Sequence, residues 1–219
     1  MSGSDRMGDR KPRRRLGRPP IDEVPEGERR AHILRAADHL FGRRGYAAVS
    51  IGDIAAEVGV SKAAIYHHFP SKDALFAAVM CETLGMIGGA IQLVMDGPGT
   101  VREKIRQLIE IAVLRVPLDA DMDSMMRDAH EHLPPARQQE IEEANAAMRG
   151  LMVELMRQGI EWGELKPADP RLLGHAFWAL LGGFVGREAA EAGFAGRPEA
   201  AMAVADLFLE GIQATADAA

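Results

Sequence analysis

The sequence predicts an all-α fold of about nine helices, with an N-terminal three-helix domain followed by a C-terminal helical bundle. Apolar residues recur every three or four positions along most of the chain, the spacing that gathers them on one face of an α-helix. The strict alternation typical of strands is missing from the sequence. Ala, Leu, Met and Glu supply much of the composition, and all four favour helices.

Composition and charge divide the chain into two parts. The 219 residues are 47% hydrophobic and 26% charged, as in a globular protein with a sizeable core. The net charge of −6 is unevenly distributed, because residues 1–75 contain 14 Lys and Arg against 10 Asp and Glu, whereas the remainder contains 12 against 22. An anionic partner is therefore expected at the N-terminal part, and a different role for the acidic remainder.

The sequence also limits the compartment and the redox chemistry. No apolar run reaches the roughly 18 residues of a membrane span, and the chain begins with charged residues, so we expect a cytoplasmic protein without a membrane partner. A single cysteine, Cys81, excludes an internal disulfide. Its apolar helical surroundings favour a packing thiol over a redox sensor.

Residues 1–27 are rich in Gly, Pro and Arg and lack an apolar period, which predicts a disordered basic arm. The Gly17-Arg18-Pro19 core resembles the AT-hook, a narrow segment that enters the minor groove of A·T-rich DNA. Two interpretations stay open: Arg18 inserts into the minor groove, or the arm is solvated and touches phosphates without specificity.

A first helix is predicted over Glu28–Arg44 and ends at Gly45. After it, the spacing of caps and glycine predicts two short helices joined by a tight turn. Ser50 and Asp53 form a capping box, Gly59 supplies the left-handed turn, and Ser61 caps the next helix. This is the pattern of a helix-turn-helix, whose second helix enters the major groove of DNA. We therefore predict a DNA-binding domain over residues 28–74.

The second helix of this motif is short and has small residues where bulk would hold DNA away. Its far end gathers side chains that can donate to phosphates. The candidate DNA contacts, with the arm included, are Arg18, Ser50, Ser61, Lys62, Ala63, Ala64, Tyr66, His67, His68 and Lys72.

The stretch Ile54–Phe76, I-A-A-E-V-G-V-S-K-A-A-I-Y-H-H-F-P-S-K-D-A-L-F, closely resembles the DNA-binding signature of tetracycline-repressor-like (TetR) regulators. Val58 stands where Ala is commoner in that family, and Ala63 where Gly is common. The resemblance implies that Ala63, Ala64 and Tyr66 approach bases. It also implies that His67, His68 and Lys72 hold the DNA backbone, while Lys62 could reach either.

Residues 75–219 are predicted to form the helical bundle. A helix capped by Ser71 runs towards Met95 and links the two domains, with glycines in its second half that favour a kink or close packing. Further helices begin at residues 100, 121, 135, 170 and 198, each marked by a capping residue, an apolar stripe or a helix-opening proline.

The last two predicted helices, 170–191 and 198–214, are apolar on more than one face, which indicates burial on both sides. We therefore expect a homodimer through these helices. The candidate interface residues are Leu173, Phe177, Leu180, Phe184, Phe208 and Ile212.

Methionines are concentrated on the helices that the bundle would gather, and their adaptable side chains suit either an irregular core or a lipophilic pocket. The family resemblance implies such a pocket. The candidate ligand-binding residues are Met86, Met125, Met126, Met152, Trp162 and Phe177.

The sequence contains neither a Gly-rich phosphate loop nor the G-x-S-x-G or His-Glu-x-x-His motifs, so we expect no enzyme. We expect neither a cofactor nor a metal, since His130 and His132 are two apart and face different sides of a helix. The leading hypothesis is a repressor, released from a palindromic operator by a small lipophilic effector. The alternative is an architectural DNA-binding or protein-interaction dimer without a ligand.

Overall fold

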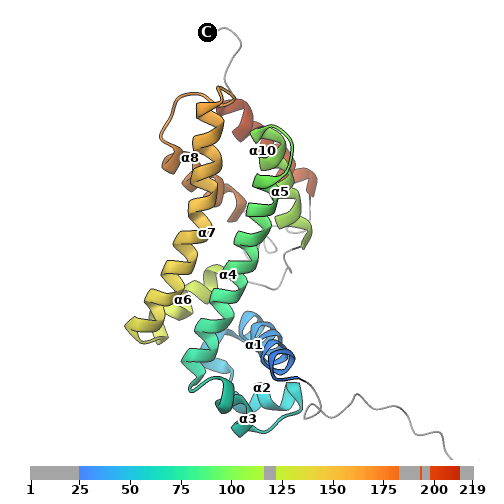
Figure 1. The fold of residues 1–219 in the computed structure, drawn as a ribbon, viewed down its shortest axis with the longest axis vertical. Coiled ribbons are helices and arrows are strands. Elements are labelled where there is room, and N and C mark those ends of the chain that lie inside the picture. The colour runs from blue at the N-terminus through green and yellow to red at the C-terminus, as the bar shows by residue number, and fades with distance from the viewer. Residues whose placement is uncertain (1–24, 116–121, 183–192, 194–197, 213–219) are drawn as a thin grey trace, which may run out of the picture.

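The computed structural model describes residues 25–115, 122–182, 193 and 198–212. The regular elements of these residues are helices, so the all-α prediction is confirmed (Figure 1). Arg18 and Phe184 lie outside the described residues. The helices are α1 (Glu26–Ala48), α2 (Ile51–Val58), α3 (Lys62–His68), α4 (Lys72–Asp96), α5 (Val101–Arg115), α6 (Met122–His132), α7 (Pro135–Glu161), α8 (Pro170–Gly182) and α10 (Pro198–Ile212).

Helices α1, α2 and α3 form the predicted helix-turn-helix head, drawn at the lower end of the molecule in Figure 1. Ser50 and Asp53 make the predicted capping box, and each residue's side chain bonds to the other's backbone N–H. Gly59 ends α2 in the left-handed conformation, at φ 79° and ψ 34°. Ser61 caps α3 by accepting from the N–H of Ala64 at 3.2 Å. Local signals therefore fix both ends of α2 and the start of α3.

Helix α4 is the shared core element of both domains. It begins at Lys72 beside α3 and packs along α7 for much of its length (Figure 1). By length and composition alone it could cross a membrane, but 44% of its most apolar window is buried inside the protein. Of the two expectations for its glycines, the structure shows close packing: a Cβ at Gly88 would lie 3.7 Å from Leu151 Cδ1 on α7.

Two connections hold the upper part of the bundle together. Thr100 and Glu103 cap α5 reciprocally, as predicted. Lys104 is only 5% exposed and donates from Nζ to the carbonyl of Met95 at 2.8 Å, which ties α5 to the C-terminal end of α4. Asp206 of α10 pairs with two arginines of α5. Helix α10 thus packs on α5 and α8 on α7, and α5 and α7 in turn pack on α4.

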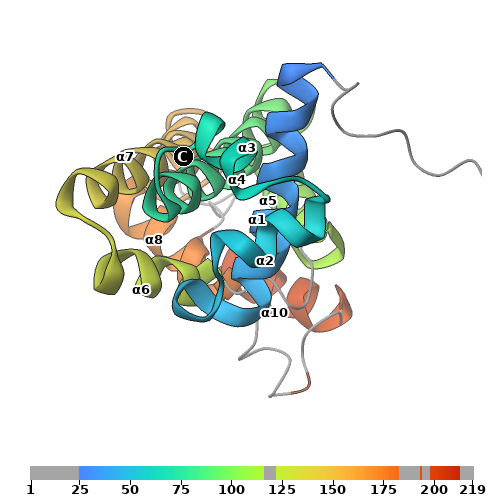
Figure 2. The ribbon, with the colours of Figure 1, turned by 90° about the horizontal axis from the view of Figure 1, so that it is seen from below.

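Helix α1 packs against both α4 and α6. Figure 2, seen from the side of the head, shows α6 beside the end of α1 and away from α3. The head is therefore attached to the bundle by the continuous helix α4 and, separately, by the packing of α6 on α1.

Candidate nucleic-acid interface and apolar hollow

Helix α3 is anchored on one side and open on the other. Ile65 is fully buried, whereas Ser61, Lys62 and Ala63 are exposed and Tyr66 is half exposed. The short helix therefore presents its N-terminal turn to solvent, which is the end that reads base edges in a helix-turn-helix. Within this exposed turn the side chains are small, apart from Lys62.

The Lys62 side chain lies across the first turn of α2. A Cβ built on Gly52 would fall 2.8 Å from Lys62 Cε and 3.2 Å from its Nζ. Because Gly52 has no side chain, the Lys62 side chain can occupy the space beside it. Sequence reasoning named Lys62 but missed Gly52, because no local pattern links a helix-start glycine to a lysine ten positions later.

Two histidines lie at the C-terminal end of α3. The rings of His67 and His68 are 5.3 Å apart between centroids, and His67 Nε2 lies 3.8 Å from a Glu26 carboxylate oxygen. Partial burial, followed by the nearby His67, lowers the pKa of His68 below its usual value. In the free protein at neutral pH the His68 ring is therefore mainly uncharged.

Lys72 occupies the first position of α4, where a helix N-terminus favours anions. Its Nζ lies 4.0 Å from the centroid of the Tyr46 ring, within the range of a cation–π contact. Burial lowers the pKa of Lys72, and the carboxylates of Asp73 and Asp128 oppose that shift. Sequence reasoning singled out Lys72 but gave no role to Tyr46, which directly follows the helix-breaking Gly45.

The residues expected to bind a ligand fall into two groups. Met125, Met152 and Phe177 are buried in the core, and Met126 packs against it. Met86 and Trp162 are 63% and 57% exposed, so they do not line a space inside the bundle. The outward position of Met86 could not be predicted from the sequence. Helix α4 is apolar on most sides, so its residue pattern does not show which face is buried.

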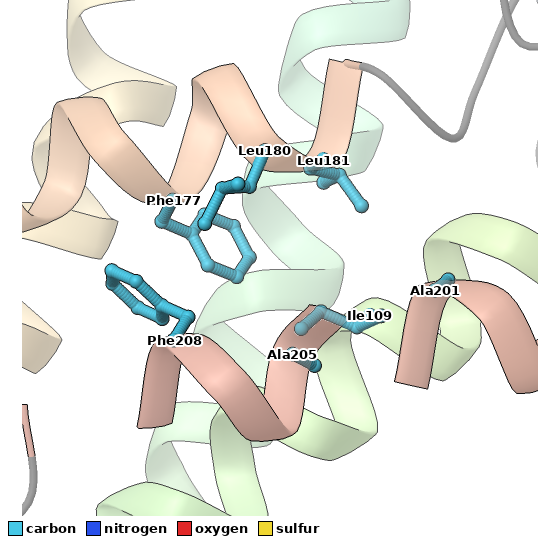
Figure 3. A pocket seen from close by; sticks show the side chains of 7 residues that line it. All are labelled: Ile109, Phe177, Leu180, Leu181, Ala201, Ala205 and Phe208. Carbon is cyan, nitrogen blue, oxygen red and sulfur yellow. The ribbon is translucent and has the colours of Figure 1, made fainter. Parts of the chain in front are cut away.

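The structure brings Phe177 to an apolar hollow between α5, α8 and α10, shown in Figure 3. The hollow is small, with a cavity volume of about 20 Å³, so a ligand larger than a water molecule would have to open it further. Its lining residues are Ile109, Phe177, Leu180, Leu181, Ala201, Ala205 and Phe208. An apolar lining of this kind suits a lipophilic group, and only Phe177 of it was expected from sequence to bind a ligand.

Helices α8 and α10 also carry exposed leucines. Leu172, Leu180 and Leu207 are 63%, 38% and 70% exposed, while Leu173 and Phe177 are buried within the protomer and Phe208 and Ile212 are half-buried. The two helices therefore leave an apolar surface in a single protomer. Among the described residues, no group of three or more His, Cys, Asp or Glu side chains could hold a metal ion.

Comparison with known proteins identifies the family. Residues 33–79 match the family described as bacterial regulatory proteins, tetR family, and residues 98–212 match the tetracyclin repressor-like C-terminal domain. The chain belongs to the TetR family. It is accordingly a DNA-binding transcriptional regulator and not an enzyme, as the sequence predicts.

Similar proteins include named regulators. The HTH-type transcriptional repressor KstR2 of Mycolicibacterium smegmatis is 26% identical over 140 residues, which cover 64% of this chain and 68% of that protein. The HTH-type transcriptional activator FasR of the same organism is 33% identical over 89 residues, 41% of each chain.

Solved structures share the fold. A putative transcriptional regulator from Saccharomonospora viridis in complex with choline has a TM-score of 0.70 at 24% identity, covering 87% of this chain and 100% of that one. FadR from Bacillus subtilis in complex with stearoyl-CoA has a TM-score of 0.65 at 18% identity, covering 84% and 99%.

The packing of Lys62 over Gly52 predicts the effect of Gly52→Ala. Ala stabilises a helix by about 1 kcal/mol relative to Gly, so the variant should be at least as stable to heat as the wild type. The added Cβ displaces Lys62, so affinity for a duplex selected by the wild-type protein should fall. Gly42→Ala is the control, since nothing lies within 4 Å of a Cβ there. A loss that persists unchanged in a Lys62→Ala background would contradict this explanation.

The depressed pKa of His68 predicts how DNA affinity depends on pH. A nearby phosphate favours the protonated ring, so DNA binding should take up a proton. Affinity should therefore rise as the pH falls from about 7.5 to about 5.5, across the range in which histidine titrates. Titrations of fluorescent duplexes should show this rise in the wild type and a flatter profile in His68→Gln. A wild-type affinity that is constant or declines towards pH 5.5 would refute the phosphate contact.

Proposed function

We propose that the protein is a cytoplasmic, ligand-responsive repressor that binds a palindromic operator as a homodimer and is released by a small lipophilic effector. Helix α3 enters the major groove, with Ala63, Ala64 and Tyr66 towards the bases. The observation that carries this proposal is the continuity of α4, which begins at the candidate phosphate contact Lys72 and ends at Asp96 in the bundle. A change in the bundle is thereby connected to the DNA surface.

The dimer follows from two arguments. One helix-turn-helix reads only a few base pairs, whereas a two-fold dimer reads two half-sites one helical turn apart. The exposed leucines at 172, 180 and 207 lie on α8 and α10, and a second copy would remove them from water. The DNA-backbone contacts from each protomer would be His67, His68 and Lys72, with Ser50, Ser61 and Lys62 beside them.

The effector is proposed from the apolar hollow and from the adaptable methionines buried in the core of the bundle. A lipophilic molecule entering beside Phe177 would press on α5 and α8, which pack on α4 and α7. The relatives in complex with stearoyl-CoA and choline support a lipophilic or a cationic effector, and the acidic C-terminal part admits the latter. To release DNA, the effector must bind the non-binding state more tightly, since equal affinity for both states shifts nothing.

The alternative of an architectural dimer without a ligand is favoured by one observation. Met152, Leu155 and Met156 are completely buried, so the centre of the bundle is densely packed. On that account the hollow at Phe177 would simply be covered by the second protomer. The two functions differ in whether any compound lowers operator affinity.

The dimer proposal predicts the behaviour of Leu180→Glu combined with Leu207→Glu. Selection from a random duplex library should give an inverted repeat with half-site centres about 10 base pairs apart for the wild type. The double variant should sediment as a folded monomer and lose that repeat, because charges on the apolar surface oppose association. Leu93→Glu, at a residue 76% exposed on α4, is the control. Dimers of the double variant at micromolar concentration would disprove the interface.

The ligand proposal predicts thermal stabilisation by a compound that fills the hollow. A ligand at 100 times its Kd raises the free energy of unfolding by about 2.7 kcal/mol. Fatty acyl thioesters, quaternary amines and aromatic lipophiles should be screened by thermal unfolding, and any hit tested for release of the selected duplex. Leu181→Phe should block the hit, because it adds bulk to the lining, whereas Leu93→Phe should not. If no compound of the panel changes the melting temperature or the operator affinity, the result favours the alternative of an architectural dimer without a ligand.

A further inference from the structure

Tyr46 lies where the head meets the bundle. It is in the last turns of α1 and contacts the first turn of α4 and the C-terminal half of α6. Its phenol O–H donates to Asp73 Oδ1, and its ring stacks on His132 with the centroids 5.5 Å apart and the planes at 22°. The ammonium of Lys72 lies 4.0 Å from the ring centroid. One side chain therefore touches the candidate phosphate contact and a helix of the bundle.

The backbone before Tyr46 is shaped to receive α6. Gly45 leaves helical geometry, at φ 77° and ψ 162°, and the N–H of Tyr46 donates to Asp128 Oδ2 at 2.7 Å. A Cβ at Gly45 would lie 3.3 Å from that same oxygen and would be strained at this positive φ. Glycine at 45 thus allows both the turn and the approach of the α6 carboxylate.

The acidic neighbour of Lys72 is held by the same tyrosine. Asp73 follows Lys72 directly, in the first turn of α4, and its carboxylate accepts the Tyr46 O–H. A carboxylate released from this bond could attract the Lys72 ammonium and repel a phosphate. The bond to Tyr46 occupies the Asp73 carboxylate while the Lys72 ammonium lies over the ring, which keeps the cation available for DNA.

We propose that Tyr46 is a positioning residue through which α6 controls the phosphate contact of Lys72. Asp128 on α6 fixes the backbone of Tyr46, and the Tyr46 side chain fixes Lys72 and Asp73. A displacement of α6 therefore changes the charge presented at the start of α4. This provides a second connection from the bundle to DNA, in addition to the continuous helix α4. The inference rests on the proposed DNA-binding role of Lys72.

The decisive variants are Tyr46→Phe, which keeps the ring and removes the O–H, and Lys72→Ala. Tyr46→Phe should weaken binding to the selected duplex about three- to fivefold, the scale of the one hydrogen bond to Asp73 that it removes. It should also lower the slope of log affinity against log salt by up to about one unit, the loss expected for Lys72→Ala. In a Lys72→Ala background Tyr46→Phe should have no further effect, because the two residues act in series.

Asp128→Ala tests the connection to α6 and should reproduce the affinity loss and the reduced salt slope of Tyr46→Phe. Asp123→Ala, which removes an exposed carboxylate from the same helix, should behave as the wild type. Asp128→Asn provides a variant of unchanged size in case the alanine form unfolds. Thermal unfolding identifies the variants that are folded under the conditions of the titration.

A readout without DNA follows from the tyrosine count. The chain has two tyrosines, so ring-labelled protein gives two carbon-13 signals, which Tyr66→Phe assigns. Burial, together with the bond to Asp73, raises the pKa of the Tyr46 phenol above its ordinary value. Asp128→Ala should bring that pKa down, since it loosens the site.

Two results would overturn the inference while leaving the proposed function intact. One is that the wild type binds DNA and that a folded Tyr46→Phe variant binds it with the same affinity and the same salt slope. The other is additive losses for Tyr46→Phe and Lys72→Ala. A wild-type protein that selects no duplex at all would instead remove the proposed function, and this inference with it.

Discussion

The bond from the Tyr46 N–H to the Asp128 carboxylate is the constraint on which the geometry of the molecule depends. It joins residues 82 positions apart and fastens the end of α1 to α6, so that the head is held at two points rather than hinged on α4 alone. An N–H bonded to a carboxylate in a partly buried place is stronger than an ordinary backbone bond. With both attachments intact, the direction of α3 is fixed relative to the bundle.

The core makes this arrangement rigid. Phe41 and Phe76 meet edge to face with centroids 5.0 Å apart, and Tyr46 packs on Phe76 in the same way at 5.1 Å. This aromatic cluster belongs to α1 and α4 together, so neither helix can tilt without disturbing the other. Motion generated in the bundle is therefore transmitted as movement of whole helices, since a close-packed interior deforms little.

The sequence predicted features governed by local interactions. The caps at Ser50, Ser61, Ser71 and Thr100 and the turn at Gly59 involve residues within a few positions of one another, and the structure has each of them. The junction at Tyr46 could not be predicted, because it depends on how α6 folds back onto α1. Met86 and Trp162 were assigned to a pocket but lie on the surface. Met86 lies on α4, which is apolar nearly all round, so the sequence does not show which side is buried. Trp162 is the C-cap residue of α7, past the helical turns to which the apolar pattern applies.

The central claim is that α6 sets the position of the recognition helices, and a distance between them tests it most directly. A nitroxide label is attached at Ala63→Cys in a Cys81→Ser background. Pulsed electron paramagnetic resonance then measures the distance between the two α3 helices of the proposed dimer. The account predicts one narrow distribution that fits grooves about 34–36 Å apart in the wild type. It predicts a broadened or shifted distribution in Asp128→Ala and no change in Asp123→Ala. An Asp128→Ala distribution identical to that of the wild type would contradict it.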